Sequence, residues 1–69
     1  MKVADLKKIV NREPFRPFAV RLNNGVRYNF TTPKDLGAAK DGRMIFYFAD
    51  SGGAVRIDSD SVVEIIETN

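Results

Sequence analysis

The stretch PFRPFAVRLNNGVRYNF, residues 14–30, decides the fold because it reads as a complete β-hairpin. Apolar residues alternate with polar ones on both sides of a turn at residues 23–25. A two-residue turn would place Leu22 opposite Arg27 and would mix the core face with the surface face. A three-residue turn keeps the apolar faces together and puts Gly25 at the left-handed position that favours glycine. The sequence therefore predicts a three-residue loop.

That register places two arginines, Arg21 and Arg27, opposite each other on the outer face of the hairpin. The other predicted pairs are Leu22 with Val26, Val20 with Tyr28 and Phe18 with Phe30. Like charges directly opposite destabilise a strand pair by about a few tenths of a kcal/mol, so a counter-charge is expected. One interpretation is an anion, such as a phosphate backbone, bound between the two guanidiniums near Arg16. The other is that Glu64 or Glu67 of the last strand pairs with them.

Outside this hairpin, the pattern predicts one N-terminal helix, a short helical insert and three more strands. Apolar residues at helical spacing predict a helix over residues 2–11. Thr32-Pro33-Lys34-Asp35 has the order of a helix start, with an N-capping threonine, a proline at the first position and an acidic residue near the positive end. The predicted strands are residues 18–22, 26–30, 44–49, 54–57 and 62–67.

A second candidate site lies on the hairpin formed by strands 44–49 and 54–57. We expect Phe46 and Phe48 to face Ile57 and Val55 across the core side of this hairpin. This arrangement leaves Ile45, Tyr47 and Arg56 on its outer face. Three interpretations stay open for them: stacking of a nucleobase, a cation–π pair, or an apolar surface covered by the N-terminal helix or by another subunit.

Length and composition restrict the chemistry. Sixty-nine residues make one domain, residues 1–69, whose small core gives marginal stability and makes self-association a hypothesis. The chain has no cysteine and no histidine, which excludes disulfides, thiolate or imidazole metal sites and the standard catalytic triads. No glycine-rich phosphate-binding motif is present. We therefore predict a non-enzymatic protein without catalytic residues, cofactor or metal.

The charge is unevenly distributed along the chain. Residues 1–43 hold ten lysines and arginines against four acidic residues, whereas residues 44–69 hold one arginine against five acidic residues. Two interpretations fit: a basic face that attracts polyanions, or two halves that neutralise each other in the fold. No apolar run approaches the length of a membrane span, and no secretory signal is evident, so we expect a cytoplasmic protein.

Two resemblances follow from these motifs. The run Pro-Phe-Arg-Pro-Phe (residues 14–18), followed by Leu-x-Asn-Gly (22–25), Tyr28 and Thr32-Pro33, resembles a group of small bacterial proteins known mainly from genomes, and implies a shared fold. The layout of a helix followed by five short strands is also similar to Sm-like proteins of the Hfq type: residues 20–25 resemble the first half of their first motif, and residues 56–63 resemble the second. The segment that carries base contacts in Sm proteins has no counterpart here, because residues 31–39 take its place.

The predicted fold is therefore mainly β with an N-terminal helix (α+β): a small, five-stranded, partly open Sm-like barrel with a short helical insert. The predicted function is a protein-interaction module, or one that self-associates into a homo-oligomer through exposed strand edges. The alternative is an Sm-like nucleic-acid-binding protein. Its contacts would be Arg16, Arg21, Arg27 and Arg43, with Tyr28 or Tyr47 for stacking.

Overall fold

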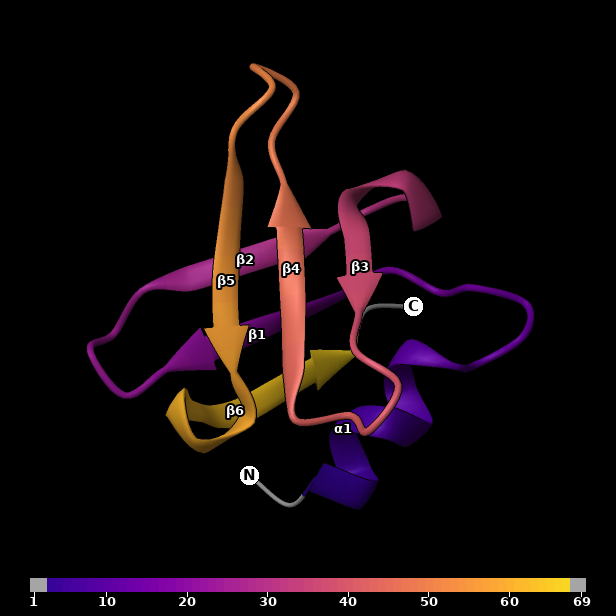
Figure 1. Cartoon of the computed structure of the whole chain (residues 1–69), viewed down its shortest axis with the longest axis vertical. Helices are drawn as coiled ribbons and strands as arrows, with labels where there is room; N and C mark the ends of the chain where they lie inside the picture. The colour runs from indigo at the N-terminus through magenta and orange to yellow at the C-terminus, as the bar shows by residue number, and fades with distance from the viewer. Residues whose placement is uncertain (1–2, 68–69) are drawn as a thin grey trace.

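The computed structural model describes residues 3–67 and arranges them as one helix, six strands and two short 3-10 turns. The strands pair as two antiparallel three-stranded sheets, in the orders β2-β1-β6 and β3-β4-β5, which cross each other in Figure 1. The elements are α1 (Val3–Val10), β1 (Phe18–Leu22), β2 (Arg27–Phe30), η1 (Pro33–Asp35), β3 (Leu36–Ala38), β4 (Met44–Phe48), β5 (Ala54–Asp58), η2 (Ser59–Ser61) and β6 (Val62–Glu67).

The first hairpin has the predicted register. Phe18 pairs with Phe30 and Arg21 pairs with Arg27. The three-residue loop is also confirmed, because the Gly25 N–H donates to the Leu22 carbonyl over 2.9 Å and Gly25 has a φ of +87°. One detail was wrong: β2 begins at Arg27, one residue later than expected, and Val26 is 41% exposed.

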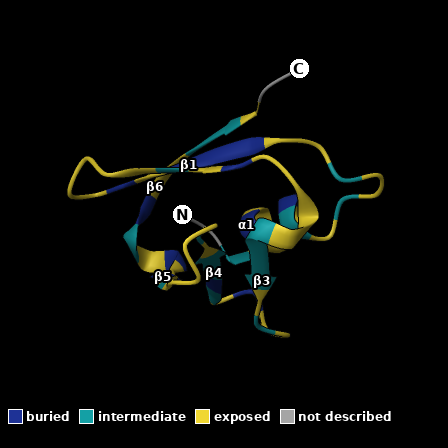
Figure 2. Ribbon diagram, turned by 90° about the horizontal axis from the view of Figure 1, so that it is seen from above, coloured by how far each residue is buried: buried dark blue, intermediate teal, exposed yellow. Residues whose placement is uncertain are grey.

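Strand β6 completes the first sheet on the other side of β1. It pairs antiparallel with β1, so that Arg21 lies opposite Glu64 and Leu22 lies opposite Val62. The register shifts between these two pairs, which leaves Val63 as an extra residue on β6, 48% exposed. Strand β1 is therefore the central strand of its sheet, and Figure 2 shows it as a largely buried segment.

The predicted register of the second hairpin was wrong by one residue. Ile45 pairs with Ile57 and Phe46 pairs with Arg56. The Ala49 N–H donates to the Gly53 carbonyl over 2.8 Å, and Gly52 has a φ of +99°, so this turn repeats the glycine-closed geometry of the first hairpin. Because adjacent residues of a strand point to opposite faces, the shift turns Ile45 and Tyr47 of β4 toward the core, whereas β5 keeps Val55 and Ile57 inside and Arg56 outside, as expected.

The helical insert expected at residues 32–39 is instead one 3-10 turn followed by strand β3. The start signals hold: the Asp35 carboxylate accepts hydrogen bonds from the Thr31 and Thr32 N–H groups, each over 3.3 Å, and from Thr31 Oγ1 over 3.1 Å. The segment then extends, because residues 36–38 pair with β4. Residues 3–67 thus form six strands in two sheets, and the five-stranded Sm-like barrel is not confirmed.

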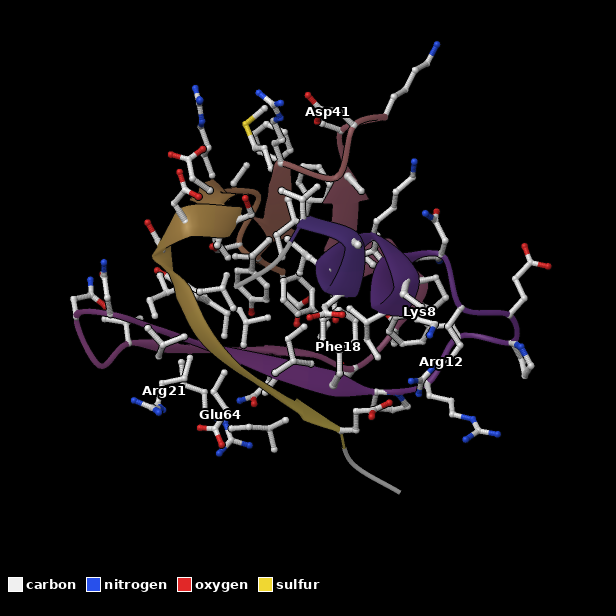
Figure 3. The ribbon with its side chains drawn as sticks, turned by 90° about the horizontal axis from the view of Figure 1, so that it is seen from below. Lys8, Arg12, Phe18, Arg21, Asp41 and Glu64 are labelled. Atoms are coloured by element: carbon white, nitrogen blue, oxygen red, sulfur yellow. The ribbon has the colours of Figure 1, made fainter. Side chains whose placement is uncertain are left out.

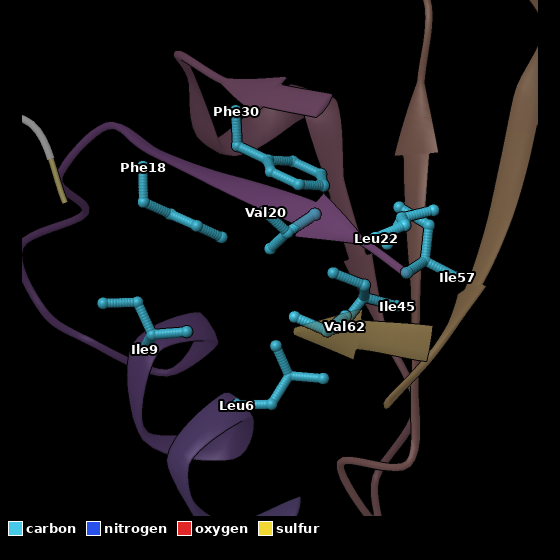
Figure 4. Packing of buried hydrophobic residues seen from close by; sticks show 9 residues of the cluster. All are labelled: Leu6, Ile9, Phe18, Val20, Leu22, Phe30, Ile45, Ile57 and Val62. Carbon is cyan, nitrogen blue, oxygen red and sulfur yellow. The ribbon is translucent and has the colours of Figure 1, made fainter. Parts of the chain in front are cut away.

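The core fills the space between the two sheets and the helix. The predicted helix, residues 2–11, is observed from Val3 to Val10, and residue 2 lies outside the described residues. Its apolar side buries Leu6 and Ile9 against both sheets (Figure 4). The buried cluster consists of Leu6, Ile9, Phe18, Val20, Leu22, Phe30, Ile45, Ile57 and Val62.

We predict that Asp35→Asn destabilises the protein at neutral pH and not in acid. Burial by itself would raise the pKa of Asp35. The hydrogen bonds from Thr31 and Thr32 lower this pKa by more than burial raises it, so it lies below its ordinary value. A pKa lowered by folding stabilises the native state above the unfolded-state pKa, about 3.9, and this contribution is lost as the pH falls through the folded value. Urea denaturation at several pH values between about 7 and 2.5 measures the difference between variant and parent.

The matched control is Asp50→Asn, since Asp50 lies exposed in the β4–β5 loop and its side chain accepts no hydrogen bond from residues 3–67. A difference for Asp35→Asn that stayed constant across this pH range would contradict the capping role.

Candidate functional site

The facing arginines Arg21 and Arg27 lie on the outer face of the first sheet, and both have partners. Arg21 Nε donates to Glu64 Oε1 over 3.0 Å. Figure 3 shows these two side chains together on the sheet face that points away from α1. Arg27 Nε donates to Asn29 Oδ1 over 3.1 Å. Of the two interpretations, pairing with the last strand is therefore confirmed for Arg21 and Glu64.

Ion pairs also join the basic and acidic parts of the chain. Glu67, the second carboxylate that was expected to pair with Arg21 or Arg27, instead forms an ion pair with Arg12. Together with Arg21–Glu64, this contact neutralises charges of the first 43 residues with charges of the last strand. The unequal charge seen along the sequence is thus partly cancelled in the folded chain.

The four arginines expected to contact nucleic acid do not form one surface. Arg21 and Arg27 share the outer face of the first sheet. Arg16 lies in the connector between α1 and β1, and Arg43 immediately precedes β4 of the other sheet. Arg43 lines a shallow open depression of about 550 Å³, whose other lining residues are Val3, Arg56, Asp58, Ser59, Asp60 and Ser61. Two carboxylates, those of Asp58 and Asp60, line the depression together with the two guanidiniums, so it offers no purely basic site.

The second predicted site is divided between two faces. Ile45 is completely buried, and Tyr47 packs against the core with its ring 5.3 Å from Tyr28 and 5.6 Å from Phe30. Arg56 lies on the opposite, outer face, where its Nε is 3.2 Å from Asp58 Oδ1. Of the three interpretations, coverage by the N-terminal helix fits Ile45, which belongs to the same buried cluster as Leu6.

The one-residue shift in the β4–β5 register places a group of apolar side chains on the outer face of the second sheet, which the sequence did not predict. We call it the aromatic face: Met44, Phe46 and Phe48 of β4 with Gly37 of β3. The rings of Phe46 and Phe48 are stacked, 6.3 Å apart with an interplanar angle of 14°, and Phe48 is 43% exposed. A Cβ at Gly37 would lie 2.8 Å from the Phe48 ring, so the missing side chain lets this ring lie on the sheet. The glycine at the second turn was the signal that could have set this register.

Residues 3–67 contain no cluster of side chains suited to holding a metal ion. No three side chains of the types that hold metals come together there, and no buried side-chain nitrogen or oxygen in that range lacks a partner. Between residues 3 and 67, no helix has both the length and the apolar character needed to cross a membrane.

Comparison with known proteins supports the fold alone. No protein-family model and no curated protein matches the sequence. A protein whose X-ray structure was determined by the Northeast Structural Genomics Consortium is similar, with 21% identity and a TM-score of 0.55. The alignment covers 75% of this chain and 89% of that one. At this identity the likeness extends to the arrangement of helix and strands.

We predict that the Arg21–Glu64 pair contributes little to stability. Both side chains are about half exposed, 47% and 50%, and exposed ion pairs contribute about 0.2–1 kcal/mol. A double-mutant cycle with Arg21→Ala and Glu64→Ala, measured by urea denaturation, should give a coupling energy in this range that shrinks in high salt. A coupling energy above about 2 kcal/mol that was insensitive to salt would show a pair shielded from solvent.

Proposed function

We propose that this chain is a non-enzymatic interaction module that binds another protein on its aromatic face. The observation that carries the proposal is the stacked pair Phe46 and Phe48 on the outer face of the second sheet. Large aromatic and methionine side chains are enriched where proteins contact each other, and a grouped set of exposed apolar side chains marks such a surface.

The arrangement of the aromatic face favours binding for a second reason. The Phe48 ring lies over Gly37 and against Phe46, so its position is already restricted before a partner arrives. Fixing a side chain on binding costs conformational entropy, and a side chain held in place beforehand loses less. Arg56 lies opposite Phe46 and pairs with Asp58, which gives the aromatic face a charged border. A central apolar contact with a polar rim is the usual composition of a protein interface.

The alternative function, Sm-like RNA binding, has less support. Arg21 and Arg27 already have partners on their own sheet. Tyr28 and Tyr47, the expected stacking residues, pack against each other and against the core. Binding of a polyanion would have to displace Glu64 from Arg21. The Sm-like barrel, the cytoplasmic location and the bacterial relationship stay predictions from the sequence.

The crosslinking test uses a benzophenone side chain placed at Phe48, with the same substitution at Val63 as its control. Both positions are exposed on the outer face of a sheet, 43% and 48%, but on different sheets. Irradiation in the source cells should give one discrete adduct at position 48, identified by mass spectrometry, and Phe46→Ser should abolish it. Equal adducts at both positions, or none at position 48, would contradict the proposal.

We also predict that purified protein does not bind single-stranded RNA or DNA with strong salt dependence. A fluorescence titration at about 50 mM and 200 mM salt measures this, because each phosphate contact steepens the loss of affinity with salt. Affinity that falls by about a hundredfold or more over this range would favour the Sm-like alternative. Arg27→Ala and Arg43→Ala would then locate the contact.

A further inference from the structure

Strand β5 leaves the longest regular edge open in the described part of the fold. The strand orders place β2 and β6 at the edges of the first sheet, and β3 and β5 at the edges of the second. Strand β3 has three residues and β2 has four, while β6 is interrupted by the register shift at Val63. Strand β5 has five residues in continuous register and no proline, and its two charged residues, Arg56 and Asp58, neutralise each other in an ion pair. Figure 1 shows no further strand beside it in its sheet.

The direction of the backbone groups on β5 follows from its hydrogen bonds with β4. The Ala49 N–H donates to the Gly53 carbonyl and the Ser59 N–H donates to the Arg43 carbonyl, each over 2.8 Å. Hydrogen-bonded pairs alternate with non-hydrogen-bonded pairs in an antiparallel ladder. The odd-numbered residues of β5 therefore bond to β4, and the N–H and C=O groups of Ala54, Arg56 and Asp58 point to the open edge.

We propose that a second copy of this chain occupies this edge, pairing its β5 antiparallel to the first around a two-fold axis at Arg56. A two-fold register centred there overlaps all five residues of both strands, and a centre elsewhere on the strand overlaps fewer. The outward groups of Ala54 then meet those of Asp58 from the second copy. The result is one six-stranded sheet and a closed dimer, since a two-fold contact leaves no equivalent edge free.

The side chains fit this register on both faces of the joined sheet. On the inner face, Val55 of each copy lies opposite Ile57 of the other, which pairs an apolar residue with an apolar residue. On the outer face, the two Arg56 side chains meet at the axis with an Asp58 on each side. The two guanidiniums face each other, which alone would be unfavourable, but each already pairs with Asp58 of its own chain, so the four side chains carry no net charge. Charge therefore balances at the contact.

The dimer would also extend the proposed binding surface, although it rests on a different feature. A two-fold axis perpendicular to a sheet keeps the outer faces of both copies on the same side. The two aromatic faces then belong to one continuous sheet. Association at β5 does not require that any other protein binds Phe46 or Phe48.

Single cysteines test this register cleanly, because the natural chain contains none. Arg56→Cys places the two sulfur atoms at the axis, where paired Cα atoms are about 5.5 Å apart, within the range for a disulfide. Ala54→Cys is the matched control on the same face of the same strand. In the proposed register its Cα is four residues, or about 14 Å, from that of its copy, too far for a disulfide. Val63→Cys is the control on the other sheet.

We expect mild oxidation to give the Arg56→Cys disulfide dimer at least about tenfold faster than either control. In parallel, light scattering of the unmodified protein should rise with concentration from 7.7 kDa toward twice that mass. Amide exchange should slow with concentration at residues 54, 56 and 58, whose N–H groups point outward, and stay unchanged at 55 and 57.

Three results would overturn the inference. These are a mass of 7.7 kDa at millimolar concentration, equal oxidation rates for Arg56→Cys and Ala54→Cys, or amide protection at the odd-numbered residues alone. The crosslink at Phe48 is an independent readout. A specific adduct there with a monomeric protein would overturn the dimer and leave the proposed function standing, whereas a dimer without an adduct would do the reverse.

Discussion

The rest of the structure depends on the position of β1 between β2 and β6. Its alternate residues Phe18, Val20 and Leu22 point into the hydrophobic core. Leu6 and Ile9 of the helix belong to the same buried cluster. Because β1 has a neighbouring strand on each side, its backbone N–H and C=O groups can form hydrogen bonds within the sheet and need no contact with solvent. Ala19 shows how closely the neighbours approach: it points to the outer face and is only 1% exposed between Asn29 and Ile66.

Two glycines then decide which side chains the sheets present to other molecules. Gly25 and Gly52 both adopt positive φ at the end of a three-residue loop, and each loop sets the register of its hairpin. In the first hairpin this register puts two arginines on the outer face. In the second it puts Phe46 and Phe48 outside and Ile45 and Tyr47 inside. A shift of one residue would exchange these faces completely, so the candidate surface is a consequence of turn geometry.

The folded chain resolves a local conflict of charge through a distant residue. Arg21 and Arg27 lie opposite each other across the hairpin and repel each other. The carboxylate that pairs with Arg21 belongs to Glu64, 43 positions away in the sequence. Such a contact exists because β6 returns along the free side of β1. It also explains why the basic first part of the sequence does not become a uniformly basic face.

The sequence by itself determined the helix, the first hairpin with its register, and the start of η1, since each depends on neighbouring residues: helical spacing, a glycine at a positive-φ position, and a carboxylate three residues after a threonine. The tertiary structure decided the rest. Residues 44–48 are apolar on both faces, so alternation could not select the inner one; in the folded chain Ile45 joins the same buried cluster as Leu6 and Phe30, in the register that the Gly52 turn sets. Leu36 and Ala38 are compatible with a helix, yet residues 36–38 form strand β3. They do so because they form antiparallel strand pairs with residues 45–47 of β4. The division of six strands into two sheets, and with it the exposed edge of β5, likewise depends on pairings between distant segments, which no local pattern records.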